Sequence, residues 1–253
     1  MSWRIGSVPY LNVRPLIFGI EDRVLQCEPS RLADLLHRGE LDAGMVPVAE
    51  VLLHDQYDVV DGIAIASRAE VRSVFLIHRV PVEQVRRVAV TTASRSSAWL
   101  ARVILKFGYG VTPDFYPLTS VAEVDGQEAV VLIGDPAIQY AATHAGKPML
   151  DLGAAWWRLT GLPFVYAVWA VQRGRGDREL VALLRAAKTT GLAHLEEIVQ
   201  NAPQATAEFR REYLTHFVCF ELGEAEKQGL RRFQEYLQQL GLVGSVHGLR
   251  YVS

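Results

Sequence analysis

The sequence predicts an α/β protein made of two lobes with a ligand cleft between them. Short apolar runs alternate with amphipathic stretches over the first two-thirds of the chain, and the apolar runs lack the strict period of two that a half-exposed sheet shows. Strands of this kind are typical of a parallel sheet covered on both faces. The pattern restarts near residue 88, and a length of 253 residues suits two small lobes.

The first unit is expected to contain five strands and three helices. The strands are Arg4–Val8, Val24–Cys27, Ala43–Val46, Val59–Ala66 and Ser73–His78. The first helix begins at Asn12 and tolerates Pro15 in its first turn. The second is capped by Ser30 and stops at Gly39, and the third spans Ala49–His54.

The second unit follows a connector over Val82–Arg87 and leads into a helical tail. Its strands are Val88–Thr92, Asp114–Tyr116, Ala129–Ile133 and the apolar run Phe164–Val171. Its helices are AWLARVILKFG, Asp135–Ala145 and GAAWWRLTG. The tail helices are Asp177–Gln200, Ala205–Phe217 and Gly223–Leu240, the last with one apolar face.

Two crossings of the chain divide this pattern into lobes. We place the outward crossing at 73–87 and the return at 162–172. The first lobe is then residues 1–85 with 170–253, and the second is residues 86–169. A cleft between such lobes is a usual place for a small ligand, because strand ends and helix N-termini of both lobes point into it.

Composition and charge exclude several classes of protein. Half of the residues are apolar and 21% are charged, which excludes a disordered chain. The formal charge of −2, from 26 Lys and Arg against 28 Asp and Glu, argues against nucleic-acid binding. The longest apolar run is too short to span a membrane, and the N-terminus lacks the features of an export signal, so we expect a cytoplasmic protein. Cys27 and Cys219 are expected to be buried thiols in a reducing compartment.

The sequence offers no local motif for a metal or a nucleotide. The seven histidines show neither HxH nor HExxH spacing, so no metal site is expected. The stretch 174–176 (GRG) lacks the third glycine of a dinucleotide fingerprint and is explained better by a turn before a helix capped by Asp177.

Two polar segments follow buried strands and are candidate binding sites. The segment TTASRSS at 91–97 supplies hydroxyls, a cation and backbone N–H groups at a helix start, which favours an anion site over simple capping by one serine. In SVPYLNVRPL, Asn12 offers a donor and an acceptor, and Arg14 could pair with a carboxylate. Asn12 as a helix cap and Arg14 as a surface residue explain this segment equally well. For Asp135, helix capping is favoured over acid–base chemistry.

Five motifs together resemble the chorismate dehydratases of the futalosine route to menaquinone. They are SVPYLNVRPL, GELDAGMVPVAE, TASRSSAWLA, VVLIGDPAI and DLGAAWWRLTGLPFVYAVW, and they occur in the family's order. The resemblance implies a type II periplasmic-binding-protein-like fold used as an enzyme. It also implies a reaction that removes water from chorismate and gives 3-[(1-carboxyvinyl)oxy]benzoate.

The same resemblance assigns roles to residues of this chain. It implies that Asn12 and Ser73 lie beside the substrate, where we expect them to be catalytic, and that Ser94, Arg95, Ser96 and Ser97 face the same cleft. Arg14 is a further binding candidate from its side chain alone. Tyr10 is assigned to packing. No cofactor is implied, and the proton acceptor is conjectured to be the enolpyruvyl carboxylate of the substrate itself.

Two other functions fit the same fold. One is an intracellular module that binds or senses a small acid without turning it over. The other is the related enzyme that forms dihydroxynaphthoate later in the route. We expect a small dicarboxylate as the partner and neither nucleic acid nor membrane, and the sequence is compatible with a homodimer.

Overall fold

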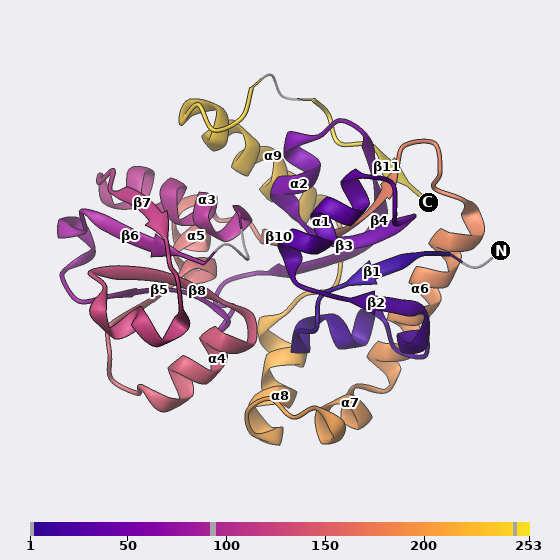
Figure 1. The fold of residues 1–253 in the computed structure, drawn as a ribbon, viewed down its shortest axis with the longest axis horizontal. Coiled ribbons are helices and arrows are strands. Elements are labelled where there is room, and N and C mark those ends of the chain that lie inside the picture. Colours follow the sequence, from indigo (N-terminus) through magenta and orange to yellow (C-terminus); the bar gives the residue numbers. More distant parts are fainter. Residues whose placement is uncertain (1–2, 92–94, 245–246) are drawn as a thin grey trace.

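The computed structural model of the chain describes residues 3–91, 95–244 and 247–253 and arranges them in two lobes, each built on one sheet (Figure 1). The first sheet has the order β11 (Tyr251–Val252), β4 (Tyr57–Ser67), β10 (Phe164–Gln172), β3 (Ala43–Pro47), β1 (Ile5–Ser7) and β2 (Val24–Gln26). The second has the order β7 (Asp114–Pro117), β6 (Arg87–Val90), β8 (Ala129–Ile133), β5 (Val74–His78) and β9 (Met149–Asp151). The predicted two-lobed α/β architecture is confirmed.

Helices surround both sheets. Those of the first lobe are α1 (Pro29–His37), α2 (Val48–Leu53), α6 (Arg178–Ala193), α7 (Leu195–Asn201), α8 (Ala207–Glu212) and α9 (Glu224–Gln239). Those of the second lobe are α3 (Arg95–Val103), α4 (Gly134–Thr143) and α5 (Leu152–Thr160). Short 3-10 helices span Leu11–Leu16, Glu21–Arg23, Val82–Gln84 and Val121–Gly126, and π-helical turns extend α3 over Ile104–Gly108 and α8 over Tyr213–Phe217. Within the described residues, no helix is long and apolar enough to cross a membrane.

The expectation of purely parallel sheets is wrong at the crossing strands. β10 is antiparallel to both of its neighbours in the first sheet, β3 and β4, and β5 is antiparallel to β8 and β9 in the second. The remaining pairs, including β1 with β2 and β6 with β7, are parallel. Both strands enter their lobe directly from the other lobe, and each is antiparallel to the strands beside it. The pattern of apolar residues is the same for a parallel and an antiparallel buried strand, so the sequence does not reveal this orientation.

Sheet membership locates the two crossings more narrowly. β4 ends at Ser67 in the first sheet and β5 begins at Val74 in the second, while the chain returns between α5 and β10. We propose lobe boundaries within 68–73 and 161–163, in place of 85/86 and 169/170. Asp151 fixes the outward crossing, because its carboxylate accepts hydrogen bonds from the backbone N–H groups of Val71 and Arg72 at 3.1 and 2.8 Å.

Two of the three predicted helix-terminal residues of α1 and α6 lie where the sequence places them. Asp177 caps α6 by accepting from the N–H of Glu179, and Gly39 follows α1 with a positive φ of 71°, both as predicted. Ser30 does not cap α1, because that helix starts one residue earlier at Pro29 and no side chain caps it. The two cysteines are free thiols, but they are half-buried and not fully buried.

The long helix α9 joins the two lobes. Its Phe233 is fully buried and lies edge-on against Trp156 of α5, with ring centroids 5.8 Å apart. The indole N–H of Trp156 donates to the carbonyl of Pro163 at 3.2 Å, in the return crossing. Gly229 allows α9 to approach that crossing, because a Cβ at this position would lie 2.0 Å from the same carbonyl oxygen.

Replacing Gly229 by alanine is therefore expected to lower the free energy of unfolding by about 1–3 kcal/mol, since the clash is with backbone and one element must shift. Urea denaturation measures this change. The matched control is Gly126→Ala, where nothing lies within 4 Å of the added methyl group. Equal stability of the two variants would show that α9 does not press on the crossing.

Candidate active site

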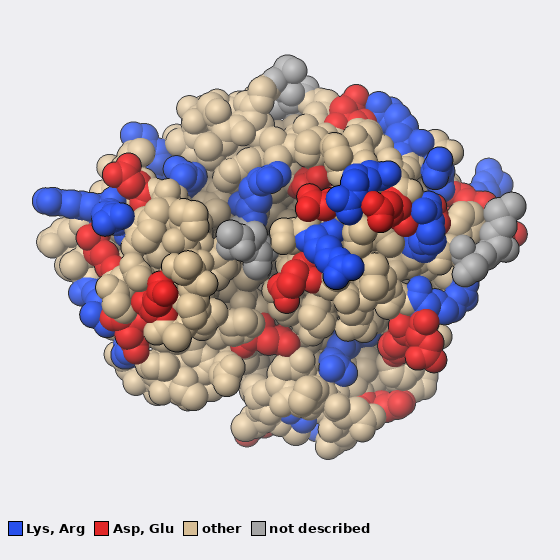
Figure 2. All heavy atoms as spheres, in the orientation of Figure 1, with Lys and Arg blue, Asp and Glu red and all other residues tan. Residues whose placement is uncertain are grey.

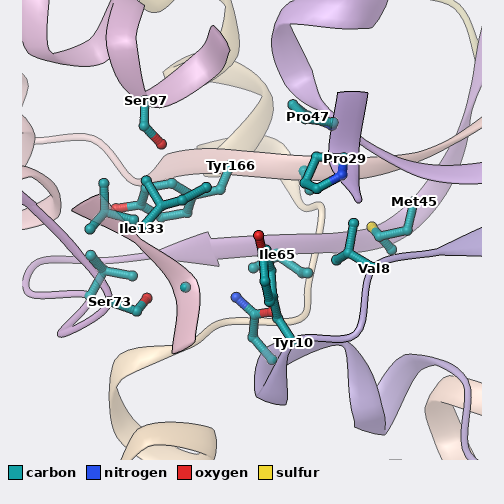
Figure 3. A pocket seen from close by; sticks show the side chains of 15 residues that line it. Val8, Tyr10, Pro29, Met45, Pro47, Ile65, Ser73, Ser97, Ile133 and Tyr166 are labelled. Carbon is teal, nitrogen blue, oxygen red and sulfur yellow. The ribbon is translucent and has the colours of Figure 1, made fainter. Parts of the chain in front are cut away.

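A pocket lies between the two lobes, where the sequence places a ligand cleft (Figure 3). It encloses about 580 Å³, counting the open space at its mouth. The first lobe and the crossings supply Val8, Tyr10, Asn12, Pro29, Met45, Pro47, Ile65, Val71, Ser73, Tyr166 and Ala167, and the second lobe supplies Val74, Ser97, Ile133 and Gly134. None of these described lining residues carries a charged side chain, so polar recognition in the pocket depends on hydroxyl, amide and backbone groups.

Asn12 and Ser73 are brought together by a third residue, Tyr213. The Asn12 amide Nδ2 donates to the Tyr213 hydroxyl at 3.3 Å, and that hydroxyl donates to Ser73 Oγ at 2.8 Å. Asn12 belongs to the 3-10 helix after β1, Ser73 directly precedes β5, and Tyr213 opens the π-helical turn after α8. Three distant segments therefore meet in one hydrogen-bonded chain at the junction of the lobes.

The direction of this chain follows from the burial of Tyr213. Its side chain is almost fully buried, and this desolvation raises the pKa of its phenol far above the ordinary value, although the hydrogen bonds to Ser73 and Asn12 oppose the rise. The phenol is therefore neutral and is the donor to Ser73, whose own hydroxyl hydrogen is left to point elsewhere. Figure 3 shows the Ser73 hydroxyl directed into the pocket. Asn12 Oδ1 is buried and accepts no hydrogen bond from any described residue.

Sequence reasoning missed Tyr213. It lies in the helical tail, outside all five motifs, and its neighbourhood (FRREYLTHF) is an ordinary amphipathic pattern. The only signal would have been a tyrosine on the buried face of a helix, where its hydroxyl needs a partner.

The three described residues of the segment 94–97 face three different surroundings. Ser97 lines the pocket and its hydroxyl points into it from the N-terminal turn of α3 (Figure 3). Ser96 is buried and faces the first lobe, where its Oγ accepts from the N–H of Ala49 at 2.9 Å. Arg95 lies in a separate hollow, with Nη1 3.8 Å from Glu50 Oε2. Ser94, together with residues 92 and 93, lies outside the described residues.

Arg14 does not line this pocket in the structure. It lies in an adjacent hollow with Phe18 and Glu197. Val8 and Tyr10 line both the pocket and this hollow and so form the wall between them. Its role as a ligand of the substrate is thus not supported by its position here.

Tyr10 forms part of the wall between the two hollows. Its ring lies against Gly134, where a Cβ would come within 3.2 Å of the ring carbons, so the packing role expected for it fits this contact. Its hydroxyl nevertheless points into the pocket (Figure 3). Burial raises the pKa of Tyr10 to about 12, which keeps the hydroxyl a donor at neutral pH.

The expectation that Asp135 caps α4 is wrong. That helix begins at Gly134, and no side chain caps it. The Asp135 carboxylate instead accepts from the N–H of Leu11 at 3.2 Å and from Gln204 Nε2 at 2.9 Å, so it ties the second lobe to two segments of the first. Burial raises the pKa of Asp135, and these two hydrogen bonds oppose the rise.

Charge on the face shown in Figure 2 is mixed. Basic and acidic side chains are interspersed there, without an extended patch of one sign. A protein that follows a phosphate backbone presents a basic stripe, and this face has none.

Two comparisons with known proteins show which family the chain resembles. The profile of a family described as menaquinone biosynthesis matches residues 3–239. A protein named chorismate dehydratase from Thermus thermophilus is 33% identical, and the match covers 92% of this chain and 94% of that protein.

Solved structures confirm the fold class. A structural-genomics protein from Archaeoglobus fulgidus matches with a TM-score of 0.75 at 16% identity and covers 95% of this chain and 98% of its own. A Candida albicans protein with the generic periplasmic-binding-protein fold matches with a TM-score of 0.69 at 15% identity, covering 98% of this chain and 92% of its own. The expected periplasmic-binding-protein-like fold is therefore confirmed.

The hydrogen bond from Ala49 to Ser96 yields a prediction about stability. Ser96→Ala removes the acceptor for an N–H in the first turn of α2, which is expected to cost about 1 kcal/mol of unfolding free energy. Chemical denaturation measures the loss. Ser30→Ala serves as control, because Ser30 is exposed and caps nothing. A loss no larger than the control's would mean that Ser96 does not fasten the lobes.

Proposed function

The chain belongs to the menaquinone biosynthesis family, and on that premise we propose that it dehydrates chorismate to 3-[(1-carboxyvinyl)oxy]benzoate. The observation that carries the proposal is the pocket between the lobes, whose described lining holds no charged side chain and includes the neutral polar residues Asn12, Ser73 and Ser97. We further propose that the reaction opens the futalosine route to menaquinone and takes place in the cytoplasm, as the resemblance of the five motifs implies.

The reaction itself demands little chemistry from the protein. The C3 proton and the C4 hydroxyl leave as water, and the electron pair of the C3–H bond completes the aromatic ring. The driving force therefore lies in the substrate. The protein has to hold a dicarboxylate, align the breaking C–H and C–O bonds and exclude water, which orientation and fixed donors can achieve.

The two ends of the pocket suit the two ends of such a substrate. Ser97 stands in the first turn of α3, where backbone N–H groups and the helix dipole favour a carboxylate. A neutral serine and amide cradle binds the anion without the need for a buried cation. We assign one substrate carboxylate to this helix start.

The reacting edge of the ring is assigned to the other end. Ser73, held by Tyr213, offers a hydroxyl hydrogen to the departing C4 oxygen, and Asn12 Oδ1 is an acceptor with no partner among the described residues. No acidic or imidazole side chain lies among the described lining residues. The enolpyruvyl carboxylate of chorismate is therefore our candidate for the proton acceptor.

The experiment that tests this function is incubation of the purified protein with chorismate. Loss of the diene absorbance, with one equivalent of the substituted benzoate formed, is the expected result. Binding of chorismate without turnover would favour a sensor module, and turnover of a different acid in a substrate panel would favour another enzyme on this fold.

Substitution of the polar residues tests the assignment of roles. Asn12→Ala and Ser73→Ala are each expected to lower kcat by about 10²–10³, because each removes a fixed polar group at the reacting edge. Steady-state kinetics measures the loss, and Ser120→Ala, an exposed serine outside the pocket lining, is the control. Near-normal turnover in both variants would remove the two residues from the mechanism.

Tyr213 is a positioning residue and predicts a different signature. Tyr213→Phe keeps the ring but leaves Ser73 without its donor, so kcat is expected to fall about tenfold with KM nearly unchanged. Tyr236→Phe is the matched control, since it removes a phenol from the aromatic cluster of α9. A rise in KM with unchanged kcat, or equal effects of the two substitutions, would contradict this role.

A further inference from the structure

A second hollow, outside the pocket, gathers two histidines and a glutamate. His37 ends α1, Glu50 lies in the first turn of α2, and His54 directly follows α2. One ligand atom from each of the three lies within 4.8 Å of the other two. The hollow is lined by these residues together with Asp34 and Arg95.

The donor set suits a particular class of ion. Two imidazole nitrogens and one carboxylate oxygen form the ligand set of many zinc sites, whereas magnesium and calcium prefer oxygen alone. Bonds of about 2.0–2.1 Å in a tetrahedral site place ligand atoms roughly 3.3 Å apart. The distance from His54 Nε2 to Glu50 Oε1 is already 3.4 Å, and His37 is exposed and able to close the remaining gap.

Glu50 provides an independent reason for a cation here. Its side chain is 10% exposed, yet among the described residues no hydrogen bond reaches its carboxylate, and the nitrogen-bearing side chains beside it are those of His54 and Arg95. Arg95 Nη1 remains 3.8 Å away. A carboxylate removed from water without close donors is costly, and a coordinated cation would offset that cost.

Arg95 is the group that would repel a cation. Its side chain is 56% exposed, so the guanidinium can turn into solvent.

We propose that His37, Glu50 and His54 bind one divalent transition-metal ion of the zinc class, with a fourth position open to water. No HxH or HExxH motif marks this cluster, because tertiary packing brings together His37 from the end of α1 and Glu50 from α2, 13 residues apart in the sequence. The ion would fasten α1 to α2. Pro29 of α1 and Pro47 at the start of α2 line both this hollow and the pocket, so the ion would stiffen one wall of the pocket.

Calorimetry with ZnCl2 on the chelator-treated chain of 253 residues tests the proposal. One ion per chain is expected, with Mg²⁺ unable to compete, and Co²⁺ should give the visible absorption of a tetrahedral site. In the double variant His37→Ala/His54→Ala, Zn²⁺ binding should weaken by about a hundredfold or more. The matched control, His194→Ala/His216→Ala, removes two exposed histidines elsewhere and should bind Zn²⁺ as the unchanged chain does.

A further variant separates loss of a ligand from loss of fold. Glu50→Gln keeps the shape of the buried side chain, and Zn²⁺ should raise the Tm of the unchanged protein but not that of this variant. No binding by the unchanged protein, or equal affinity of the cluster and control double variants, would overturn the proposal. Because these readouts need no chorismate, they are independent of the proposed enzymatic function.

Discussion

The site depends on one hydrogen-bonded chain, from Asn12 through Tyr213 to Ser73. Its members come from the first connection of the first lobe, from the crossing into the second lobe and from the helical tail. Because Tyr213 is buried and neutral, its hydroxyl is the donor in the hydrogen bond to Ser73. The Ser73 hydroxyl, which is directed into the pocket, can then donate its own hydrogen to a ligand. The packing of the helical tail at the junction of the lobes therefore also holds Asn12 and Ser73 in place beside the pocket.

The lack of charged side chains among the described lining residues is the second feature on which the proposed function rests. The described pocket lining holds no charged side chain, and Asp135, a half-buried carboxylate in the first turn of α4, accepts hydrogen bonds from Leu11 and Gln204 at the lobe junction. A preorganised set of hydroxyl and backbone donors costs little reorganisation when charge moves during the reaction. Such a pocket suits a reaction whose driving force lies in the substrate.

Sequence patterning predicted most elements and the two-lobed fold, because a strand covered on both faces is a short apolar run and a helix covered on one face is amphipathic. It did not predict the features that depend on which segments pair in three dimensions. The antiparallel direction of β5 and β10 has no local signature, and β9 and β11 are too short to show a period. Asp135 resembles a helix cap in the sequence because Pro136 follows it, although α4 begins at Gly134. The contact of Tyr213 with Ser73 and the cluster of His37, Glu50 and His54 join residues distant in the sequence, so only tertiary packing reveals them.

A crystal structure of the protein with 3-[(1-carboxyvinyl)oxy]benzoate bound tests most directly whether Asn12, Ser73 and the start of α3 hold the reacting molecule. We expect the product in the pocket between the lobes, with one carboxylate at the N-terminal turn of α3 beside Ser97 and the ring edge within hydrogen-bonding reach of Asn12 and Ser73. A product held elsewhere, or bound here by a charged side chain with Asn12 and Ser73 turned away, would contradict this expectation.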